Sequence, residues 1–231
     1  MKIRPIEVGV LGTNCYIAYN DAGEAVNERQ PVENTESSCE GQHSGSKMCV
    51  IIDPGDDPKR IIGIMSELTV IPSAILLTHG HFDHIGAVGG LAEKYPDIRI
   101  YAGKDENALL NDPELNLTGR LRRPGRVNAD RLTCDNEIFE EAGIVFRSIA
   151  TPGHTAGSVC YLVEKENVLF SGDTLFRMSM GRTDFPTGNG SQILKSLKKL
   201  AELPDETLVF PGHGEKTSIG EEKRDNPYLL Q

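Results

Sequence analysis

Short apolar runs with high strand propensity alternate with amphipathic helical patterns along all 231 residues. The runs that predict strands are Ile3–Val8, Asn14–Tyr19, Met48–Asp53, Ala74–Leu77, Arg99–Ala102, Val145–Ala150, Ser158–Val163, Val168–Ser171 and Thr207–Phe210. Apolar residues at helical spacing predict helices over Pro58–Leu68, Ile85–Tyr95, Lys104–Leu110 and Ser191–Leu200. Because strands and helices come in mixed order, we expect an α/β protein in which layers of helix cover sheets.

One polar segment, at about residues 20–47, interrupts this pattern. It is rich in Glu, Asn, Gln, Ser and Gly, a composition typical of a mobile loop or a disordered insert. It joins two predicted strands that are expected to form a hairpin, Asn14–Tyr19 and Met48–Asp53. Because Asp53 ends the second strand, the hairpin tip should lie roughly 17–20 Å from it. We therefore expect a single domain over residues 1–231, with the insert and its His43 away from any chemistry.

Five of the six histidines fall in three short phrases, which are THGHFDH at residues 78–84, TPGH at 151–154 and FPGHG at 210–214. A fourth phrase, FSGDT at 170–174, adds a carboxylate. Each phrase follows a predicted strand, so the loops are expected to meet at one edge if the strands share an orientation. Imidazole and carboxylate are the usual ligands of zinc and similar ions. The candidate metal ligands are His79, His81, Asp83, His84, His154, Asp173 and His213.

The number of candidate ligands indicates how many ions the site holds. One tetrahedral ion with an open catalytic position needs about three protein ligands. Seven ligands are too many for one such ion and suit two ions that share a bridging carboxylate. Two ions some 3.5–4 Å apart can hold a hydroxide between them, which gives the site a hydrolytic role.

Charge and composition exclude several classes of protein. A formal net charge of −10 argues against nucleic acid as a partner, because phosphate binding needs a basic face. No apolar run approaches the length of a membrane span, and the start of the chain lacks the apolar stretch of a signal peptide. Five cysteines, an odd number without a C-x-x-C pair, suit a reducing compartment. We expect a cytoplasmic protein with a small-molecule partner, and the sequence leaves its oligomeric state open.

The four phrases, together with SGDTLF at 171–176 and GRTDFP at 181–186, resemble the metallo-β-lactamase superfamily. Within it, the chain looks similar to the glyoxalase II-like (hydroxyacylglutathione hydrolase-like) branch. The similarity runs from Leu11–Cys15 to Asn226–Tyr228, apart from the insert. It implies a four-layer αβ/βα sandwich with the site in a groove at one edge of two facing sheets. It also implies a first ion on His79, His81 and His154, a second ion on Asp83, His84 and His213, and Asp173 as the bridge.

The same resemblance implies a binuclear metal-dependent hydrolase. Its expected activity is that of a thioesterase, in which a metal-bridging hydroxide attacks S-(2-hydroxyacyl)glutathione-like thioesters and Asp83 holds that hydroxide. The expected cofactors are two divalent ions, with zinc first and iron or manganese as alternatives. Asp53 is expected to hydrogen-bond a ligating histidine, although a turn carboxylate before Pro54 is an equal alternative.

Substrate identity rests on fewer residues. The glutathione-specific branch has a basic residue nine positions after the bridging aspartate, and Arg182 occupies that position as a candidate for binding a substrate carboxylate. The branch has an aromatic residue two positions later, where this chain has Asp184, followed by Phe185. Longer members carry a helical carboxy-terminal domain, which we do not expect here because 18 residues follow His213.

Three alternatives stay open from the sequence. One is a mononuclear-iron persulfide dioxygenase, and the complete second ligand set argues against it. Another is a lactonase, β-lactamase or other hydrolase of the same fold, since fold and site are shared among these activities. The most distant is a non-catalytic metal-binding module, which would bind metal without turnover.

Overall fold

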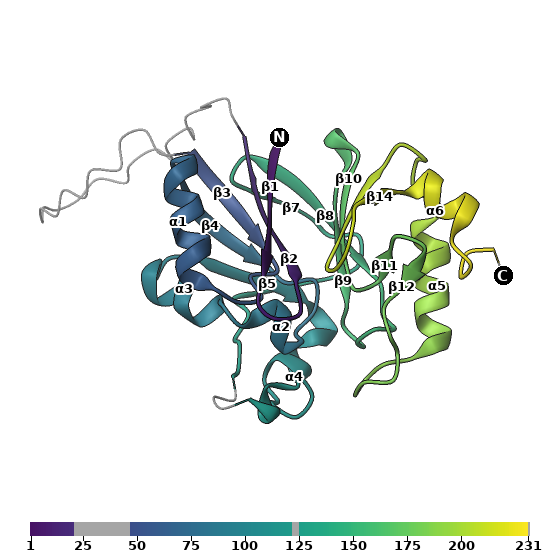
Figure 1. The fold of residues 1–231 in the computed structure, drawn as a ribbon, viewed down its shortest axis with the longest axis horizontal. Helices are drawn as coiled ribbons and strands as arrows, with labels where there is room; N and C mark the ends of the chain where they lie inside the picture. Colours follow the sequence, from purple (N-terminus) through teal and green to yellow (C-terminus); the bar gives the residue numbers. More distant parts are fainter. Residues whose placement is uncertain (21–46, 122–124, 231) are drawn as a thin grey trace, which may run out of the picture.

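The computed structural model describes residues 1–20, 47–121 and 125–230. Its main elements are two six-stranded sheets, which face one another with helices on their outer sides (Figure 1). The insert at residues 21–46, including His43, lies outside the described residues, so the prediction about its place stays a prediction.

The first sheet has the strand order β1-β2-β3-β4-β5-β6. Its strands are β1 (Lys2–Val8), β2 (Thr13–Tyr19), β3 (Lys47–Ile52), β4 (Val70–Leu76), β5 (Arg99–Gly103) and β6 (Arg131–Thr133). Strands β1 to β3 pair antiparallel, and β3 to β6 pair parallel. The antiparallel register that pairs Tyr16 with Ile52 and Tyr19 with Cys49 confirms the predicted pairing of these two strands.

The second sheet has the order β14-β13-β10-β9-β8-β7. Its strands are β7 (Ile138–Glu141), β8 (Ile144–Ala150), β9 (Val159–Val163), β10 (Val168–Gly172), β13 (Leu208–Pro211) and β14 (Thr217–Ser218). β10 and β13 pair parallel, and the other neighbours pair antiparallel. A separate two-stranded sheet consists of β11 (Leu175–Phe176) and β12 (Ser179–Met180).

Three hydrophobic clusters separate four layers. On the outer side of the first sheet, α1 (Pro58–Leu68) and α3 (Val88–Lys94) bury Ile61, Met65 and Leu91 against the strands. Alternate strand residues point the other way, as the two-residue period of a strand requires, and meet the second sheet. This middle cluster includes Tyr16, Ile52, Tyr101, Phe146, Tyr161 and Phe170.

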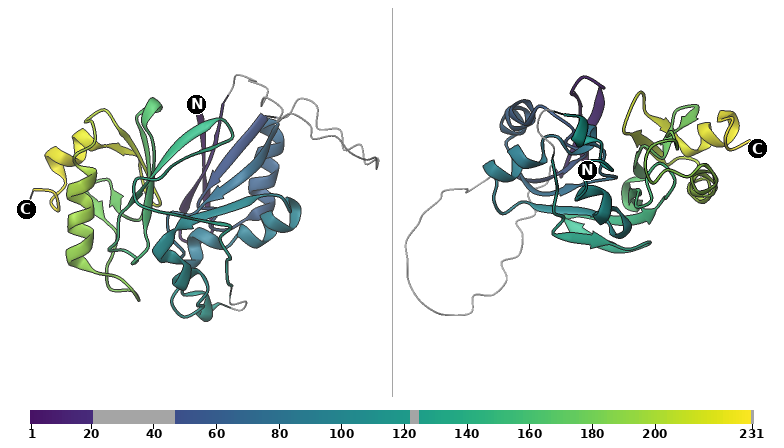
Figure 2. Two further views of the ribbon diagram at one scale, coloured as in Figure 1. Left: turned by 180° about the vertical axis from the view of Figure 1, so that it is seen from behind. Right: turned by 90° about the horizontal axis from the view of Figure 1, so that it is seen from below.

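The fourth layer is α5 (Gly190–Leu200), which packs Leu197 and Leu200 onto the outer side of the second sheet. α6 (Ile219–Asp225) extends this cluster through Ile219. Figure 2 shows the two helical layers on opposite sides of the paired sheets. The predicted four-layer αβ/βα sandwich is therefore confirmed.

The elements that the sequence did not predict are short. β6, β7, β11, β12, β14 and α6 contain between two and seven residues, too few for a periodic pattern to emerge. The predicted helix over Ile85–Tyr95 was wrong in one respect, because the chain forms α2 (Phe82–Ile85) and then α3. The amide of Ala87 donates to the carbonyl of Pro54 instead of continuing α2, and Gly86 packs directly against Gly55.

The prediction over Lys104–Leu110 also divides, into the 3₁₀ turn η1 (Lys104–Glu106) and the short helix α4 (Asn107–Leu110). Both elements lie directly after β5, close to the ligand loops described below. In the described part of the chain, no helix combines the length and apolar character needed to cross a membrane.

Candidate metal centre

Four of the seven candidate ligands come from one continuous segment after β4. His79 and His81 lie in the loop that follows the strand, and Asp83 and His84 lie in α2. The helix begins within the ligand run, and the amide of His84 donates to the carbonyl of His81 at 2.9 Å. The short helical turn therefore brings the second pair of ligands back over the first pair.

The other three ligands come from separate loops of the second sheet. His154 follows β8, Asp173 directly follows β10, and His213 follows β13. β9 is antiparallel to both β8 and β10, while β10 is parallel to β13, so the three ligand-bearing strands run in one direction. Their carboxyl ends share an edge, as the sequence predicted.

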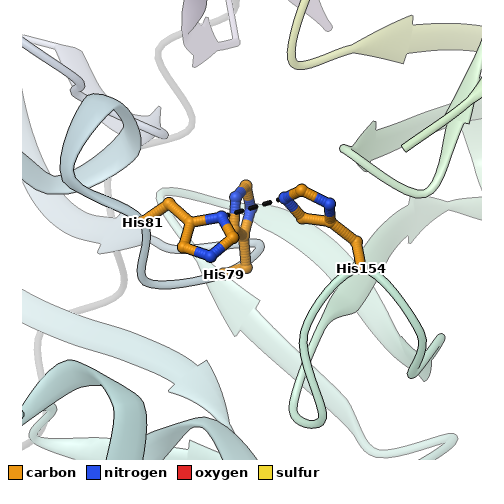
Figure 3. Close-up of side chains that lie close together, drawn as sticks. All are labelled: His79, His81 and His154. Atoms are coloured by element: carbon orange, nitrogen blue, oxygen red, sulfur yellow. Dashed lines mark hydrogen bonds between the residues drawn. The ribbon is translucent and has the colours of Figure 1, made fainter. Parts of the chain in front are cut away.

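The first ligand group consists of His79, His81 and His154, whose ligand atoms all lie within 4.8 Å of one another. The His81 Nδ1 and His154 Nε2 atoms are 2.9 Å apart, and the three rings converge on a common point (Figure 3). The Nε2 atom of His79 is buried without a hydrogen-bond partner. Buried polar atoms are rarely left unpaired, so an unpaired nitrogen that faces other ligands fits a metal ion.

The second ligand group consists of Asp83, His84 and His213. The His213 Nε2 atom is 3.2 Å from Asp83 Oδ2, and the His84 Nε2 atom is 3.7 Å from the same oxygen. Asp173 lies between the two groups, with Oδ1 3.3 Å from His84 Nε2 and Oδ2 3.6 Å from His154 Nε2. The structure thus brings all seven candidate ligands together at one edge of the sheets.

Asp53 and Thr78 orient the rings of two of the candidate ligands, His79 and His84. Asp53 accepts hydrogen bonds from the Thr78 amide at 2.8 Å and from the Thr78 hydroxyl at 2.6 Å, and its Oδ2 lies 3.1 Å from His84 Nδ1. Because the Thr78 hydroxyl donates to Asp53, it accepts from His79 Nδ1, 3.2 Å away. With the proton on Nδ1, each ring in its neutral form would present a lone pair on Nε2.

A backbone carbonyl orients His154 in the same way. The Nδ1 atom of His154 lies 2.7 Å from the carbonyl oxygen of Arg182, so it donates there and leaves Nε2 free for the first group. Space for the ligands depends on glycine at two positions. A Cβ at Gly212 would lie 2.2 Å from Asp173 Oδ1, and one at Gly181 would lie 1.8 Å from the Asp173 carbonyl oxygen.

Burial and neighbouring charges set different protonation states in the two ligand groups. Burial lowers the pKa of His79 well below its ordinary value and lowers the pKa of His81 to about 3. Burial alone would raise the pKa of Asp83, but the charges of His84 and His213 outweigh it and hold that pKa far below its usual range. Burial alone would lower the pKa of His84, but the charges of Asp173, Asp53 and Asp83 outweigh it and raise that pKa well above its ordinary value. A metal ion bound to the second group would therefore displace a proton from His84. The residues present fit divalent ions.

Two residues at the start of β2 also contact the site, and sequence reasoning gave them no role. The Thr13 hydroxyl donates to Asp83 Oδ2 at 3.1 Å. The Asn14 side chain donates to the carbonyls of Pro211 and Gly214, at 3.0 and 2.9 Å, on either side of His213. Both belong to the Leu11–Cys15 opening that carried part of the resemblance, which was the available signal for them.

The Arg182 guanidinium lies at the rim rather than against the ligands. It makes two hydrogen bonds of 2.7 Å to the Asp184 carboxylate, and its centre is 3.9 Å from the centroid of the Phe185 ring. The Phe185 ring in turn meets the His81 ring edge-on, with centroids 5.5 Å apart. A substrate carboxylate would therefore compete with Asp184 for this guanidinium.

Comparison with known proteins agrees with this geometry. The family model of the metallo-beta-lactamase superfamily matches residues 44–213. A probable metallo-hydrolase of Bacillus subtilis, YqgX, is 40% identical over 99% of this chain and 98% of its own length. The hydroxyacylglutathione hydrolase GloC of Haemophilus influenzae is 34% identical over 86% of this chain and 95% of its own length.

Two solved structures are similar over nearly the whole chain. The crystal structure of BLEG-1, a B3 metallo-beta-lactamase, has a TM-score of 0.84 and 38% identity, and the match covers 100% of both chains. The structure of TTHA1623 in a di-iron-bound form has a TM-score of 0.77 and 33% identity, over 98% of this chain and 100% of that one. This chain belongs to the metallo-β-lactamase superfamily and is a metallo-hydrolase of that family.

Proposed function

We propose that this protein is a thioesterase, which uses two divalent ions to hydrolyse S-(2-hydroxyacyl)glutathione-like thioesters. The observation that carries the two-ion proposal is the position of Asp173, whose oxygens lie 3.3 Å from His84 and 3.6 Å from His154. A carboxylate between two complete ligand groups supports a pair of adjacent ions. Zinc is the ion we propose, although the same donors accept iron and manganese.

The ligands differ in their access to solvent, which suggests where the substrate enters. The side chains of His213, Asp83 and Asp173 are 27%, 14% and 11% exposed, whereas that of His84 is fully buried. When bound, the two ions supply Lewis acidity and lower the pKa of a water molecule towards neutrality. Asp83 is ionised and held by Thr13, so it can accept a hydrogen bond from the attacking water and orient it.

Two features support a glutathione-like thioester as the substrate class. GloC, which is similar over most of this chain, is a hydroxyacylglutathione hydrolase. Arg182 provides a planar guanidinium at the rim, a group suited to a carboxylate of the leaving thiol. The Asp184 pairing weakens this contact, so we expect a higher KM than a free arginine would give.

Hydrolysis of β-lactams is a second candidate, because the similarity to BLEG-1 covers the full length of both chains. Both reactions use the same attack on a carbonyl carbon, and they differ in the group that the rim must hold. The persulfide dioxygenase alternative differs in kind, since it would use one iron and consume oxygen.

The test combines metal analysis with a panel of substrates. Metal per chain is measured by emission spectroscopy, and the loaded protein is given S-lactoylglutathione, a simple lactone, a cephalosporin and glutathione persulfide. We expect two ions per chain and the highest kcat/KM with the thioester. A higher kcat/KM with the cephalosporin would favour the second candidate. One iron per chain with oxygen uptake on the persulfide would overturn the proposal, and full loading without any turnover would favour a binding module.

The rim arginine gives a sharper test of the substrate class. Arg182→Ala should raise KM for S-lactoylglutathione about tenfold, because a charge-assisted contact is worth about 1.5–3 kcal/mol when fully made and Asp184 already shares it. It should leave KM for a neutral thioester unchanged. Asp184→Asn should lower KM for S-lactoylglutathione, because it frees the guanidinium. Equal effects on both thioesters would contradict carboxylate recognition by Arg182.

A further inference from the structure

Glu106 lies buried between the two loops that carry the first ligand group. It ends η1, directly after β5, and its side chain has no exposed surface. Its Oε1 atom accepts a hydrogen bond of 2.7 Å from the Gly80 amide. Its Oε2 atom accepts one of 2.8 Å from the Thr155 hydroxyl and one of 3.0 Å from the Gly157 amide.

These partners flank the ligands of the first group. Gly80 stands between His79 and His81, and Thr155 directly follows His154. One carboxylate therefore joins a loop of the first sheet to a loop of the second sheet, at the point where His81 Nδ1 and His154 Nε2 approach to 2.9 Å. We propose that Glu106 is a positioning residue, which holds the two loops of the first ligand group at a fixed distance from each other. This inference rests on the metal centre of the proposed function.

The chemistry of the bridge requires a carboxylate. All three partners donate, and an ionised carboxylate is the side chain that only accepts. Burial raises the pKa of the Glu106 carboxyl to about 7, while the bonds from Gly80, Thr155 and Gly157 oppose that rise. A glutamine of the same shape would turn its NH₂ group towards either the Gly80 amide or the Gly157 amide. It would therefore break one end of the bridge whichever way it pointed.

Close packing on both sides leaves little room for another arrangement. A Cβ at Gly157 would lie 2.0 Å from the Glu106 amide nitrogen, and a Cβ at Gly80 would lie 2.7 Å from the Leu110 side chain. The segment from β5 to α4 thus lies against both ligand loops and fixes the distance between them. Loss of one hydrogen bond would let one loop shift relative to the other, and the His81–His154 spacing would change with it.

Glu106→Gln tests the proposal through metal affinity rather than turnover. Affinities for Zn²⁺ alone are measured by competition with a chromophoric chelator, and Co²⁺ absorption reports the geometry of the ligand groups. Partners of metal ligands typically contribute 10–100-fold to affinity, so we expect a loss of that size at one of the two ions. In a His213→Ala background, which removes a ligand of the second group, the remaining ion should show the same loss. In a His154→Ala background, Glu106→Gln should change the affinity of the remaining ion less than threefold.

Glu141→Gln is the matched control. Glu141 is another buried acid, bonded to Tyr101 and Arg99 away from the ligand loops. Glu141→Gln should lower the melting temperature and leave the affinities for both Zn²⁺ ions within twofold of those of the original protein. If Glu106→Gln lowers the melting temperature in the same way and leaves the affinities unchanged, Glu106 is merely structural and the proposal is overturned.

Thr155→Val provides a milder variant in case Glu106→Gln does not fold. Thr155→Val removes one of the three hydrogen bonds to Glu106, so the affinity for the first ion should fall several-fold. An unchanged affinity would overturn the proposal. The measurement needs no substrate, so it separates the two claims. A protein that binds Zn²⁺ as described but hydrolyses no thioester would refute the thioesterase proposal and leave the role of Glu106 intact.

Discussion

The two halves of the molecule, which are the first sheet (β1 to β6) with its helices and the second sheet (β7 to β10, β13 and β14) with its helices, contribute to the metal centre in different ways. The first half supplies His79, His81, Asp83 and His84 from six consecutive residues. The second half supplies His154, Asp173 and His213, each from a different loop. The first set is therefore brought together by local chain geometry, whereas the second set depends on strand direction and tertiary contacts.

The contacts that hold the ligands follow the same division. In the first half, Asp53 binds Thr78 and His84 from the same sheet. In the second half, the loop around His213 is held by Asn14 and by the Tyr16 hydroxyl, which reaches the Pro211 carbonyl at 2.6 Å. Both of these residues belong to the first half. The loop that carries His213 is therefore positioned by contacts between the two sheets.

Asp173→Ala should have the largest effect, because Asp173 contacts both ligand groups. Outer partners of a ligand typically contribute 10–100-fold, so losing a shared ligand should reduce kcat/KM by more than about 100-fold. Metal content should fall as well, measured as ions per chain after dialysis. An unaffected rate would show that the two ligand groups work without a shared carboxylate.

Asp53→Asn should come next and act within the first half. An amide at this position places an NH₂ group against the Thr78 donors or against His84 Nδ1. We expect kcat/KM to fall about 10–100-fold and the free energy of unfolding to fall by about 1–3 kcal/mol. Urea denaturation and steady-state kinetics measure the two effects. Asp56→Asn, an exposed acid in the same turn, should change neither, and a comparable loss there would point to the turn itself.

Asn14→Ala tests the contact between halves. It removes two hydrogen bonds to the loop around His213, so unfolding should become easier by about 1–2 kcal/mol. Because that loop carries a ligand of the second group, the affinity for the second ion should fall more than the affinity for the first ion, as measured by competition with a chelator. Asn20→Ala is the matched control, since Asn20 directly follows the other end of β2 and donates to the Gly143 carbonyl. Equal weakening of both ions by Asn14→Ala would contradict loop-specific positioning.

The same division explains what the sequence could predict. The sequence predicted that the seven candidate ligands meet at one edge, because their phrases combine histidine or aspartate with the glycine-rich turns that follow apolar strands. Their role as metal ligands stays a prediction. The α/β class was also predicted, since nine strands and the helices α1 and α5 have clear patterns, whereas the four-layer sandwich was predicted from the family resemblance. The division of residues 85–95 between α2 and α3 was missed, because it depends on contacts with Pro54 and Gly55 from another part of the chain.

Residues that act through the backbone were not predicted. Glu106 and Asn14 bind carbonyls and amides of distant loops, and no local pattern marks such a partner. Arg182 was predicted as a carboxylate-binding residue, and that role stays a prediction. The sequence could not show that Asp184, two positions later, already pairs with its guanidinium.

Lys199→Met should have the smallest effect and concerns the outer support of the His154 loop. Lys199 lies 2.6 Å from Asp135 and 3.1 Å from the Ala150 carbonyl, and Asp135 accepts from the Ala150 amide at 2.8 Å. Ala150 ends β8, four residues before His154. An exposed ion pair of this kind contributes about 0–1 kcal/mol, so the free energy of unfolding at pH 7 should fall by about that amount. The rate should stay within twofold, because the side chain lies outside the ligand groups.

The pH dependence of that loss separates charge from packing. Burial alone would raise the pKa of Asp135, but the bonds from Lys199 and Ala150 outweigh it and lower that pKa below its usual value. The pair therefore stabilises the fold fully above the unfolded pKa of about 3.9, and the stabilisation fades as the pH falls through the folded pKa. Urea denaturation of the metal-free protein should show the variant and the original converging in acid. Lys198→Met on the same helix should show no such convergence. If Lys199→Met lowers the free energy of unfolding equally at pH 7 and in acid, the apolar stem of the lysine supports the His154 loop, and its charge does not.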